Sequence, residues 1–215
     1  TLELLGQIPD GQVKEFNEND QVIMEAEYKD NKLNGEMIRY DDEGEIISRE
    51  TYSEGMLQGA AKYYQYRNGL KLKAECTYKN SLLHGPRTAY YEDGTLKLEE
   101  NYRHGKLSGV RSSYYSNGKL ETRENFLEGK LSGERTVYFP TGELWYKENY
   151  KAGRLEGERL SYFTNGAKRL EEFYVDGMLE GSRKIYSETG EILTNEDYHW
   201  GTLTHNTERK KIHDK

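Results

Sequence analysis

The chain has 215 residues, a formal net charge of −7 and a single cysteine, Cys76. The mildly acidic balance argues against a nucleic-acid partner and disfavours an anionic membrane, because both require a basic surface. One cysteine excludes an internal disulfide and a cysteine-based zinc site, and no apolar run approaches the roughly 20 residues of a transmembrane helix. The sequence begins at Thr1 rather than Met, so a cytoplasmic location and export after removal of an upstream signal segment both stay open.

Glycine recurs along the chain at a nearly constant interval, which is the signature of a repeat protein. The interval is 24 residues except for one of 26, at Gly11, Gly35, Gly59, Gly85, Gly109, Gly133, Gly157 and Gly181. If each of these glycines is position 0, an aromatic residue recurs at position 5, a glutamate at position 15, a second aromatic at position 17 and leucine at position 22. In the repeat that begins at Gly109 these residues are Tyr114, Glu124, Phe126 and Leu131.

In chain order we expect an N-terminal cap at residues 1–10, eight repeats at 11–204 and a C-terminal tail at 205–215. Each repeat holds two short runs of β-forming residues, and each run ends at a turn such as Asn117-Gly118 or Ala152-Gly153. Glycine favours a hairpin there because it reaches positive φ at no steric cost. The repeats therefore predict an all-β fold, an elongated single antiparallel sheet built as a meander of about sixteen strands, two per hairpin repeat.

The two turns of each repeat predict a definite register. If the residues at positions 5 and 11 share a face, they pair across the first hairpin and leave a three-residue loop that ends in glycine, a common connection. At the second turn, pairing of Tyr150 with Leu155 makes Ala152-Gly153 the turn itself. Gly157 then falls inside a strand, where it indicates a bulge or a break.

A single long sheet cannot bury both faces, so we expect aromatic ladders, above all the position-5 tyrosines, to carry the stability. The third repeat is irregular. Residues 65–69 contain an insertion, Ser81 replaces a turn glycine, and Cys76 lies near the glutamate column. The local register is open there.

The run Gly-x4-Tyr-Tyr/Phe-x2-Gly-x-Leu-x3-Glu-x-Tyr-x2-Gly-x-Leu-x-Gly resembles the MORN-repeat-variant family of bacteria, most closely at residues 109–133. The resemblance covers most of the chain, and the third repeat departs from it. Many members of that family are described as antitoxins of toxin–antitoxin systems, and related MORN repeats occur beside phosphatidylinositol phosphate kinase domains. The resemblance implies an elongated sheet of hairpins that contacts proteins or lipids, and it implies no catalytic residues because the motif is structural.

The sequence offers no catalytic, cofactor or metal motif. The glutamates at position 15 recur once per repeat, whereas a catalytic dyad needs one special place, so we interpret them as structural. The histidines share no metal-ligand spacing, and His84 and His104 fall at turns, where a solvated histidine is the simpler interpretation. Cys76 has no motif around it and is expected to be a packed thiol.

Two columns are candidates for partner binding. Position 2 holds an arginine in five consecutive repeats: Arg87, Arg111, Arg135, Arg159 and Arg183. Position 6 holds an aromatic residue in four: Tyr91, Tyr115, Phe139 and Phe163. Strand alternation places both columns on one face, opposite the position-5 tyrosines. Arginine beside aromatic rings is typical of interface hot spots, although the arginines could instead lie over their own neighbours and cover them.

Two functions stay open. The first is a non-catalytic scaffold for an unidentified protein partner, with an antitoxin- or immunity-like role for this protein as its narrower form. The second is a membrane- or phosphoinositide-associated module, which the net charge of −7 disfavours unless a local basic face exists. The oligomeric state is open as well.

Overall fold

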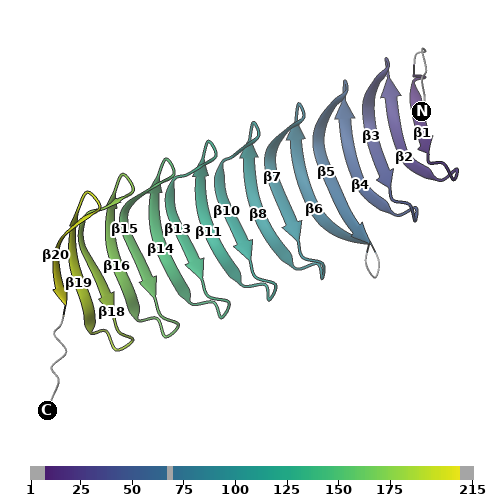
Figure 1. Cartoon of the computed structure of the whole chain (residues 1–215). Coiled ribbons are helices and arrows are strands. Elements are labelled where there is room, and N and C mark those ends of the chain that lie inside the picture. Colours follow the sequence, from purple (N-terminus) through teal and green to yellow (C-terminus); the bar gives the residue numbers. More distant parts are fainter. Residues whose placement is uncertain (1–7, 67–69, 209–215) are drawn as a thin grey trace. The chain divides into compact units, whose positions relative to one another are not determined.

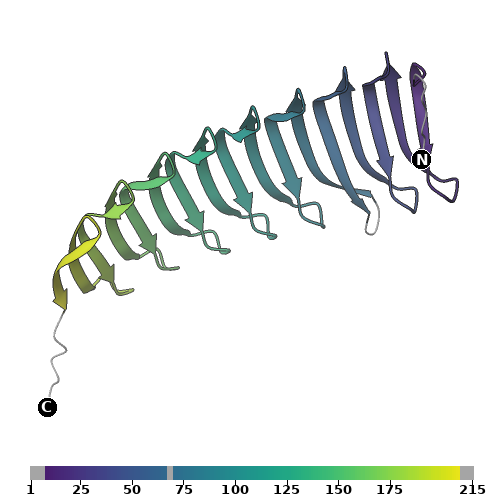
Figure 2. The same ribbon diagram turned by 45° about the horizontal axis from the view of Figure 1, so that its top comes forward.

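The computed structural model describes residues 8–66 and 70–208, and every regular element in those ranges is a β-strand. The chain divides into two compact units, Thr1–Lys106 (unit 1) and Leu107–Lys215 (unit 2). Within each unit the successive strands lie side by side and alternate in direction (Figure 1 and Figure 2). Each unit is thus an open antiparallel meander of hairpin repeats, which confirms the predicted fold class.

In unit 1 each strand pairs with the next one in the sequence. The strands are β1 (Gly11–Phe16), β2 (Val22–Lys29), β3 (Lys32–Tyr40), β4 (Ile46–Ser53), β5 (Met56–Tyr66), β6 (Leu70–Lys79), β7 (Leu82–Tyr90) and β8 (Leu96–Arg103). A two-residue strand, β9 (Lys106–Leu107), stands at the boundary of the two units.

Unit 2 follows the same plan, except that at some strand positions in the sheet one residue outside the regular pairing divides the chain into a short and a long strand. The strands are β10 (Gly109–Tyr114), β11 (Leu120–Leu127), β12 (Lys130–Leu131), β13 (Gly133–Tyr138), β14 (Leu144–Lys151), β15 (Arg154–Tyr162), β16 (Lys168–Val175), β17 (Met178–Leu179), β18 (Gly181–Tyr186), β19 (Ile192–His199) and β20 (Thr202–Glu208). Strands β12 and β13 both pair with β11, one after the other along its length. In the same way, β17 and β18 both pair with β16.

The first turn of each repeat has the predicted loop. Tyr138 pairs with Leu144. The Phe139 N–H donates to the Glu143 carbonyl over 2.8 Å, and Gly142, with φ +104, closes a three-residue loop. A feature that we did not predict follows at once, because Val137 pairs with Tyr146 rather than with Trp145. One extra residue therefore bulges out of the second strand, and every later pair in the hairpin is shifted by one.

The second turn also confirms the prediction. Tyr150 pairs with Leu155, and both turn residues between their flanking partners have positive φ, Ala152 at 51° and Gly153 at 87°. Beyond the turn the register shifts by two, around Gly157 with φ +86. Glycine tolerates this backbone conformation because it has no Cβ.

Neighbouring repeats are linked through their second turns. The carbonyl of each position-22 leucine accepts a hydrogen bond from the turn of the following repeat, as from the Gly177 N–H to the Leu155 carbonyl over 2.9 Å. The residue at position 23 adds a side-chain contact, since Glu156 accepts from the Asp176 N–H over 2.9 Å. The same glycine-to-leucine bond joins Gly55 to Leu33 in unit 1 over 2.8 Å. Each repeat therefore orders the next one.

The irregular third repeat keeps a continuous register. Its strands β5 and β6 are longer than their counterparts and pair from Gly59–Tyr78 to Tyr66–Leu70, so the insertion lengthens one hairpin. Ser81 occupies its turn position with φ +62. The remaining inserted residues, 67–69, lie outside the described residues, as do 1–7 of the expected cap and 209–215 of the expected tail. Strand β20 continues through His205, which we had placed at the start of the tail.

The buried row is not the one that we expected. The position-5 aromatics are half-buried in most repeats, and Phe16 is 53% exposed. Most of the least exposed side chains lie at positions 2 and 15, such as Met37 at 2%, Ala61 at 0% and Glu148 at 4%, with Ser161 and Ser48 beside them at positions 4 and 13. The position-5 ladder, which we expected to carry the stability, is therefore not the most buried row of the sheet. The core is a central row that crosses the strands at positions 2 and 15.

Candidate functional site

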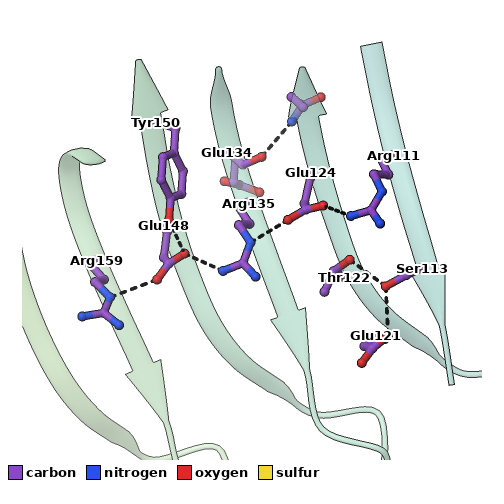
Figure 3. Close-up of polar contacts among 11 residues, drawn as sticks. Arg111, Ser113, Glu121, Thr122, Glu124, Glu134, Arg135, Glu148, Tyr150 and Arg159 are labelled. Carbon is purple, nitrogen blue, oxygen red and sulfur yellow. Dashed lines mark hydrogen bonds and ion pairs between the residues drawn. The ribbon is translucent and has the colours of Figure 1, made fainter. Parts of the chain in front are cut away.

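The central row of unit 2 is ionic. It alternates arginines from position 2 with glutamates from position 15, and we call it the Arg–Glu row: Arg111, Glu124, Arg135, Glu148, Arg159, Glu172, Arg183 and Glu196. Each arginine lies directly opposite a glutamate, as Arg135 opposes Glu148. Figure 3 shows five of these side chains, Arg111, Glu124, Arg135, Glu148 and Arg159, reaching toward one another from neighbouring strands.

Each interior glutamate is held between two arginines. Glu148 accepts from Arg135 Nη1 at Oε2 over 2.8 Å and from Arg159 Nε at Oε1 over 2.9 Å. The Tyr150 hydroxyl donates to the same Oε2 over 3.1 Å. Arg135 in turn donates through Nε to Glu124 over 2.8 Å, so one guanidinium links two carboxylates. The row is a continuous network rather than a set of separate pairs.

Because the network is buried, each charged side chain in it depends on its partners to stay ionised. The side chain of Glu148 is 5% exposed, and that of Arg135 is 27% exposed. Burial opposes ionisation of Glu148, but the hydrogen bonds from Arg135, Arg159 and Tyr150 outweigh it and lower the carboxyl pKa. For Arg135 burial likewise opposes the charge, while the bonds to Glu124 and Glu148 raise its pKa. A buried charge is tolerated only when it is paired in this way.

The predicted arginine column therefore binds carboxylates of its own chain. Arg111, Arg135, Arg159 and Arg183 all donate to glutamates of the row, and in unit 1 Arg87 donates to Glu100. The guanidinium groups that we considered for partner binding are thus bound to carboxylates within the protein. Arg159 also covers a neighbour, since its guanidinium carbon lies 5.5 Å from the centre of the Tyr146 ring.

The predicted aromatic column lies at the first turns, and its residues are half-buried. Phe139 stacks on Trp145 at 5.1 Å with 20° between the rings, and Trp145 lies 4.9 Å from Tyr146. Because Arg159 covers Tyr146, these contacts join the aromatic and arginine columns on one side of the sheet, as strand alternation predicted.

The other aromatics of this column also have defined neighbours. The Tyr115 hydroxyl donates to the Tyr138 carbonyl over 2.7 Å. Arg169 lies over Phe163 at 5.7 Å, and in unit 1 Lys97 lies over Tyr91 at 5.3 Å. Sequence reasoning missed Trp145 because it is the bulged residue of its strand, and the turn residues do not indicate a bulge there. We call Tyr115, Phe139, Trp145 and Phe163 the aromatic edge of unit 2.

The described residues contain no group of three or more histidine, cysteine or acidic side chains able to hold a metal ion. His84 and His104 meet edge to face at the second turns, with ring centres 5.1 Å apart. Cys76 is a free, buried thiol whose pKa is raised by burial. No helix in the described part of the chain is long and apolar enough to cross a bilayer.

Comparison with known proteins identifies a family and a weak similarity to a solved structure. Among solved structures, a chain of "Crystal structure of GtfA/B complex bound to UDP and GlcNAc" is similar at 15% identity over 51% of this chain, with a TM-score of 0.23. The present chain spans 21% of that chain, and a likeness so low supports no argument about fold or function. No curated protein matches.

The family comparison is specific. The model described as "MORN repeat variant" matches residues 9–30, 33–54, 83–104, 107–128 and 131–152. These five segments cover 110 of the 215 residues. Each segment ends at the first residue of a second turn. The family unit therefore contains one first hairpin, and the second strand of that hairpin leads into the second turn. The chain belongs to the MORN-repeat-variant family.

Proposed function

We propose that this protein is a non-catalytic repeat scaffold that binds a protein partner through the aromatic edge of unit 2. The observation that carries the proposal is the placement of half-exposed aromatic rings on successive first turns, on the side of the sheet that also holds the arginine column. Contacts at the first turns, such as the hydrogen bond from Tyr115 to the Tyr138 carbonyl and the stacking of Phe139 on Trp145, hold these rings in place. A partner would therefore find them already ordered, and binding would cost little conformational entropy.

Spacing supports an extended contact. Successive repeats are two strands apart, which is about 10 Å at about 4.8 Å per strand. A partner that reaches along this edge could therefore contact several rings at once, and aromatic side chains dominate the energetics of many interfaces. In this proposal the arginines act indirectly. Their bonds to glutamates fix the sheet behind the rings, and only their exposed faces are available to the partner.

A narrower form of the proposal is an antitoxin or immunity role, in which the partner is a toxin. The family resemblance is its sole support. The alternative of an anionic membrane or phosphoinositide partner rests on resemblance too, and charge opposes it. Residues 1–106 contain 20 acidic and 14 basic residues, and residues 107–215 contain 18 and 17. The arginines of unit 2 are further neutralised by the glutamates of their own row.

The test compares two tagged baits. A protein captured by the wild-type chain and lost from Phe139→Ser with Phe163→Ser is the candidate partner, and its binding is then measured with purified components. We expect the double variant to raise the dissociation constant at least about tenfold. Vesicles containing phosphoinositide should bind neither bait.

The matched control is Tyr162→Ser, which removes a half-buried position-5 aromatic from the opposite face. Unfolding midpoints of all variants separate lost binding from lost fold. A purified partner that binds the double variant as tightly as the wild type would refute the aromatic edge as the site. Vesicle binding that depends on the aromatic edge would favour the membrane alternative.

A further inference from the structure

The residue directly before a position-0 glycine ties the next second turn to the preceding part of the sheet. Its side chain accepts a hydrogen bond from the backbone N–H of the first residue in that turn. The link between the third and fourth repeats has a histidine as acceptor, since His84 Nδ1 accepts from the His104 N–H over 3.4 Å. Elsewhere the acceptor is a carboxylate or an amide, at 2.8–2.9 Å from the donor: Asp10, Gln58, Glu156 and Glu180.

A histidine differs from these other acceptors because one proton removes its capacity to accept. The bond from the His104 N–H requires the neutral ring of His84 with its proton on Nε2. Histidine changes charge between about pH 5 and pH 8, whereas an amide does not titrate and a carboxylate still accepts at about pH 5. When His84 is protonated, both of its ring nitrogens are donors, and the bond to the turn is lost.

The surroundings of His84 do not compensate for that charge. The rings of the half-buried His84 and the exposed His104 have centres 5.1 Å apart, so protonation of both would bring two positive charges together. The segments that flank the link, residues 77–86 and 101–107, contain no acidic residue. Strands β6 and β8 and the chain after the turn bring only basic or phenolic groups from these segments: Tyr78, Lys79, Tyr102, Arg103 and Lys106.

Unit 2 has a histidine at an equivalent link with the opposite response. Glu180 accepts from the Trp200 N–H at Oε2 over 2.8 Å, and its Oε1 lies 3.0 Å from His199 Nδ1. Protonation of His199 makes that second contact a charge-assisted hydrogen bond and leaves the acceptor of the turn in place. Mild acid that opens the link at His84 should therefore leave the link at Glu180 closed.

We propose that His84 makes one inter-repeat link of unit 1 sensitive to pH, holding the second turn of the fourth repeat when neutral and releasing it when protonated. The Gly105 N–H, which donates to the Leu83 carbonyl over 2.8 Å, is the backbone bond that opens with it. The contribution of His84 is complete above the range in which histidine titrates and is lost as the pH falls through that range. The link is separate from the proposed partner site, which lies in unit 2.

The test measures amide hydrogen exchange of the full chain, residue by residue, by NMR at about pH 7.5 and about pH 5.5, relative to the intrinsic rate at each pH. The protection of Gly105 should fall about threefold to tenfold at the lower pH, as expected for the loss of one hydrogen bond. The protection of Gly201, which donates to the Leu179 carbonyl over 2.9 Å, should not fall. His84→Gln should abolish the pH dependence of Gly105, because the amide of Gln58 accepts the same bond in the preceding link.

A second variant separates the two histidines. His104→Asn removes the facing ring but keeps the backbone N–H that His84 accepts, and asparagine tolerates the positive φ of 50° at this turn. Gly105 should keep most of its pH dependence in this variant. The proposal would be overturned by equal protection of Gly105 at both pH values in the wild type, by a dependence that persists in His84→Gln, or by an equal fall at Gly201. A dependence that His104→Asn abolishes would overturn it too, since His104 would then be the sensor.

Discussion

Units 1 and 2 fill the same central row with different chemistry. From the N-terminus, the first three repeats of unit 1 place mostly apolar residues at positions 2 and 15: Val13, Ala26, Met37, Glu50, Ala61 and Cys76. Its last repeat already holds an ion pair there, Arg87 with Glu100. Unit 2 fills the equivalent places with the Arg–Glu row. The turns and backbone pairing are alike in both. The repeat backbone therefore accepts either filling, and the side chains decide how strongly neighbouring repeats depend on one another.

Apolar packing and ion pairing differ in how strictly they fix the direction in which a side chain must point. Apolar packing at Met37 needs only a side chain of the right volume, and its loss is felt locally. An arginine such as Arg135 bonds to glutamates on both neighbouring strands, so a change there removes a partner from Glu148 of its own repeat and from Glu124 of the preceding one. Glu50 is the informative exception, because it is 7% exposed in unit 1 and accepts the Tyr52 hydroxyl over 2.8 Å with apolar residues opposite it.

The largest expected effect comes from the carboxylates of the two rows. Glu148→Gln should destabilise unit 2 by about 3 kcal/mol, because it removes one of the two charged partners of both Arg135 and Arg159. Glu50→Gln should cost less than about 1 kcal/mol, since the amide oxygen can still accept from Tyr52. Urea unfolding followed by hydrogen exchange and mass spectrometry assigns the loss to each unit. Equal costs at the two sites would contradict the distinction between the rows.

Next in size is the apolar counterpart in unit 1. Met37→Ala should cost about 2–3 kcal/mol, because the side chain is 2% exposed and its removal leaves a cavity. The loss should stay in the repeats around β3. Exchange protection in unit 2 is the readout, and a fall there as large as in unit 1 would show that apolar packing transmits as far as the ionic row does.

Lowering the pH should reduce the free energy of unfolding of unit 2 more than that of unit 1, by on the order of 1 kcal/mol for each paired carboxylate. The pKa of Glu148 is lowered in the folded state, whereas an unfolded glutamate has a pKa of about 4.3. Its contribution is complete above that value and is lost as the pH falls through the folded pKa. Both tryptophans, Trp145 and Trp200, lie in unit 2, so fluorescence reports that unit. The urea unfolding midpoint of unit 2 should decrease as the pH is lowered below about 4. Glu148→Gln should make this midpoint less dependent on pH.

The smallest effect concerns position 17. Tyr150 and its equivalents donate a hydroxyl to the glutamate two residues earlier, but unit 2 has Phe126 at one such place. Phe126→Tyr should stabilise by about 0.5–1 kcal/mol by adding a donor to Glu124, and Tyr150→Phe should destabilise by a similar amount. Thermal unfolding of both variants is the measurement. Destabilisation by Phe126→Tyr would show that the network around Glu124 has no room for a third donor.

Much of the fold follows from the sequence alone, because its signals are local. A glycine at each turn specifies the three-residue loop before Leu144 and the tight turn at Ala152-Gly153, and Gly157 indicates the bulge behind it. These features depend on backbone conformations that only a few residue types adopt. Alternation along the strands likewise predicts that the arginine and aromatic columns share a face.

The tertiary structure decided which residues meet across the strands. In a straight hairpin the pairing of Tyr138 with Leu144 would set Arg135 opposite Lys147, a repulsive neighbour. The bulge at Trp145 shifts the register by one and sets Arg135 opposite Glu148 instead. That single shift creates the Arg–Glu row and sets Tyr146, rather than Trp145, opposite Val137. It could not be predicted from the turn residues, because its advantage lies in the pairing of charges on neighbouring strands.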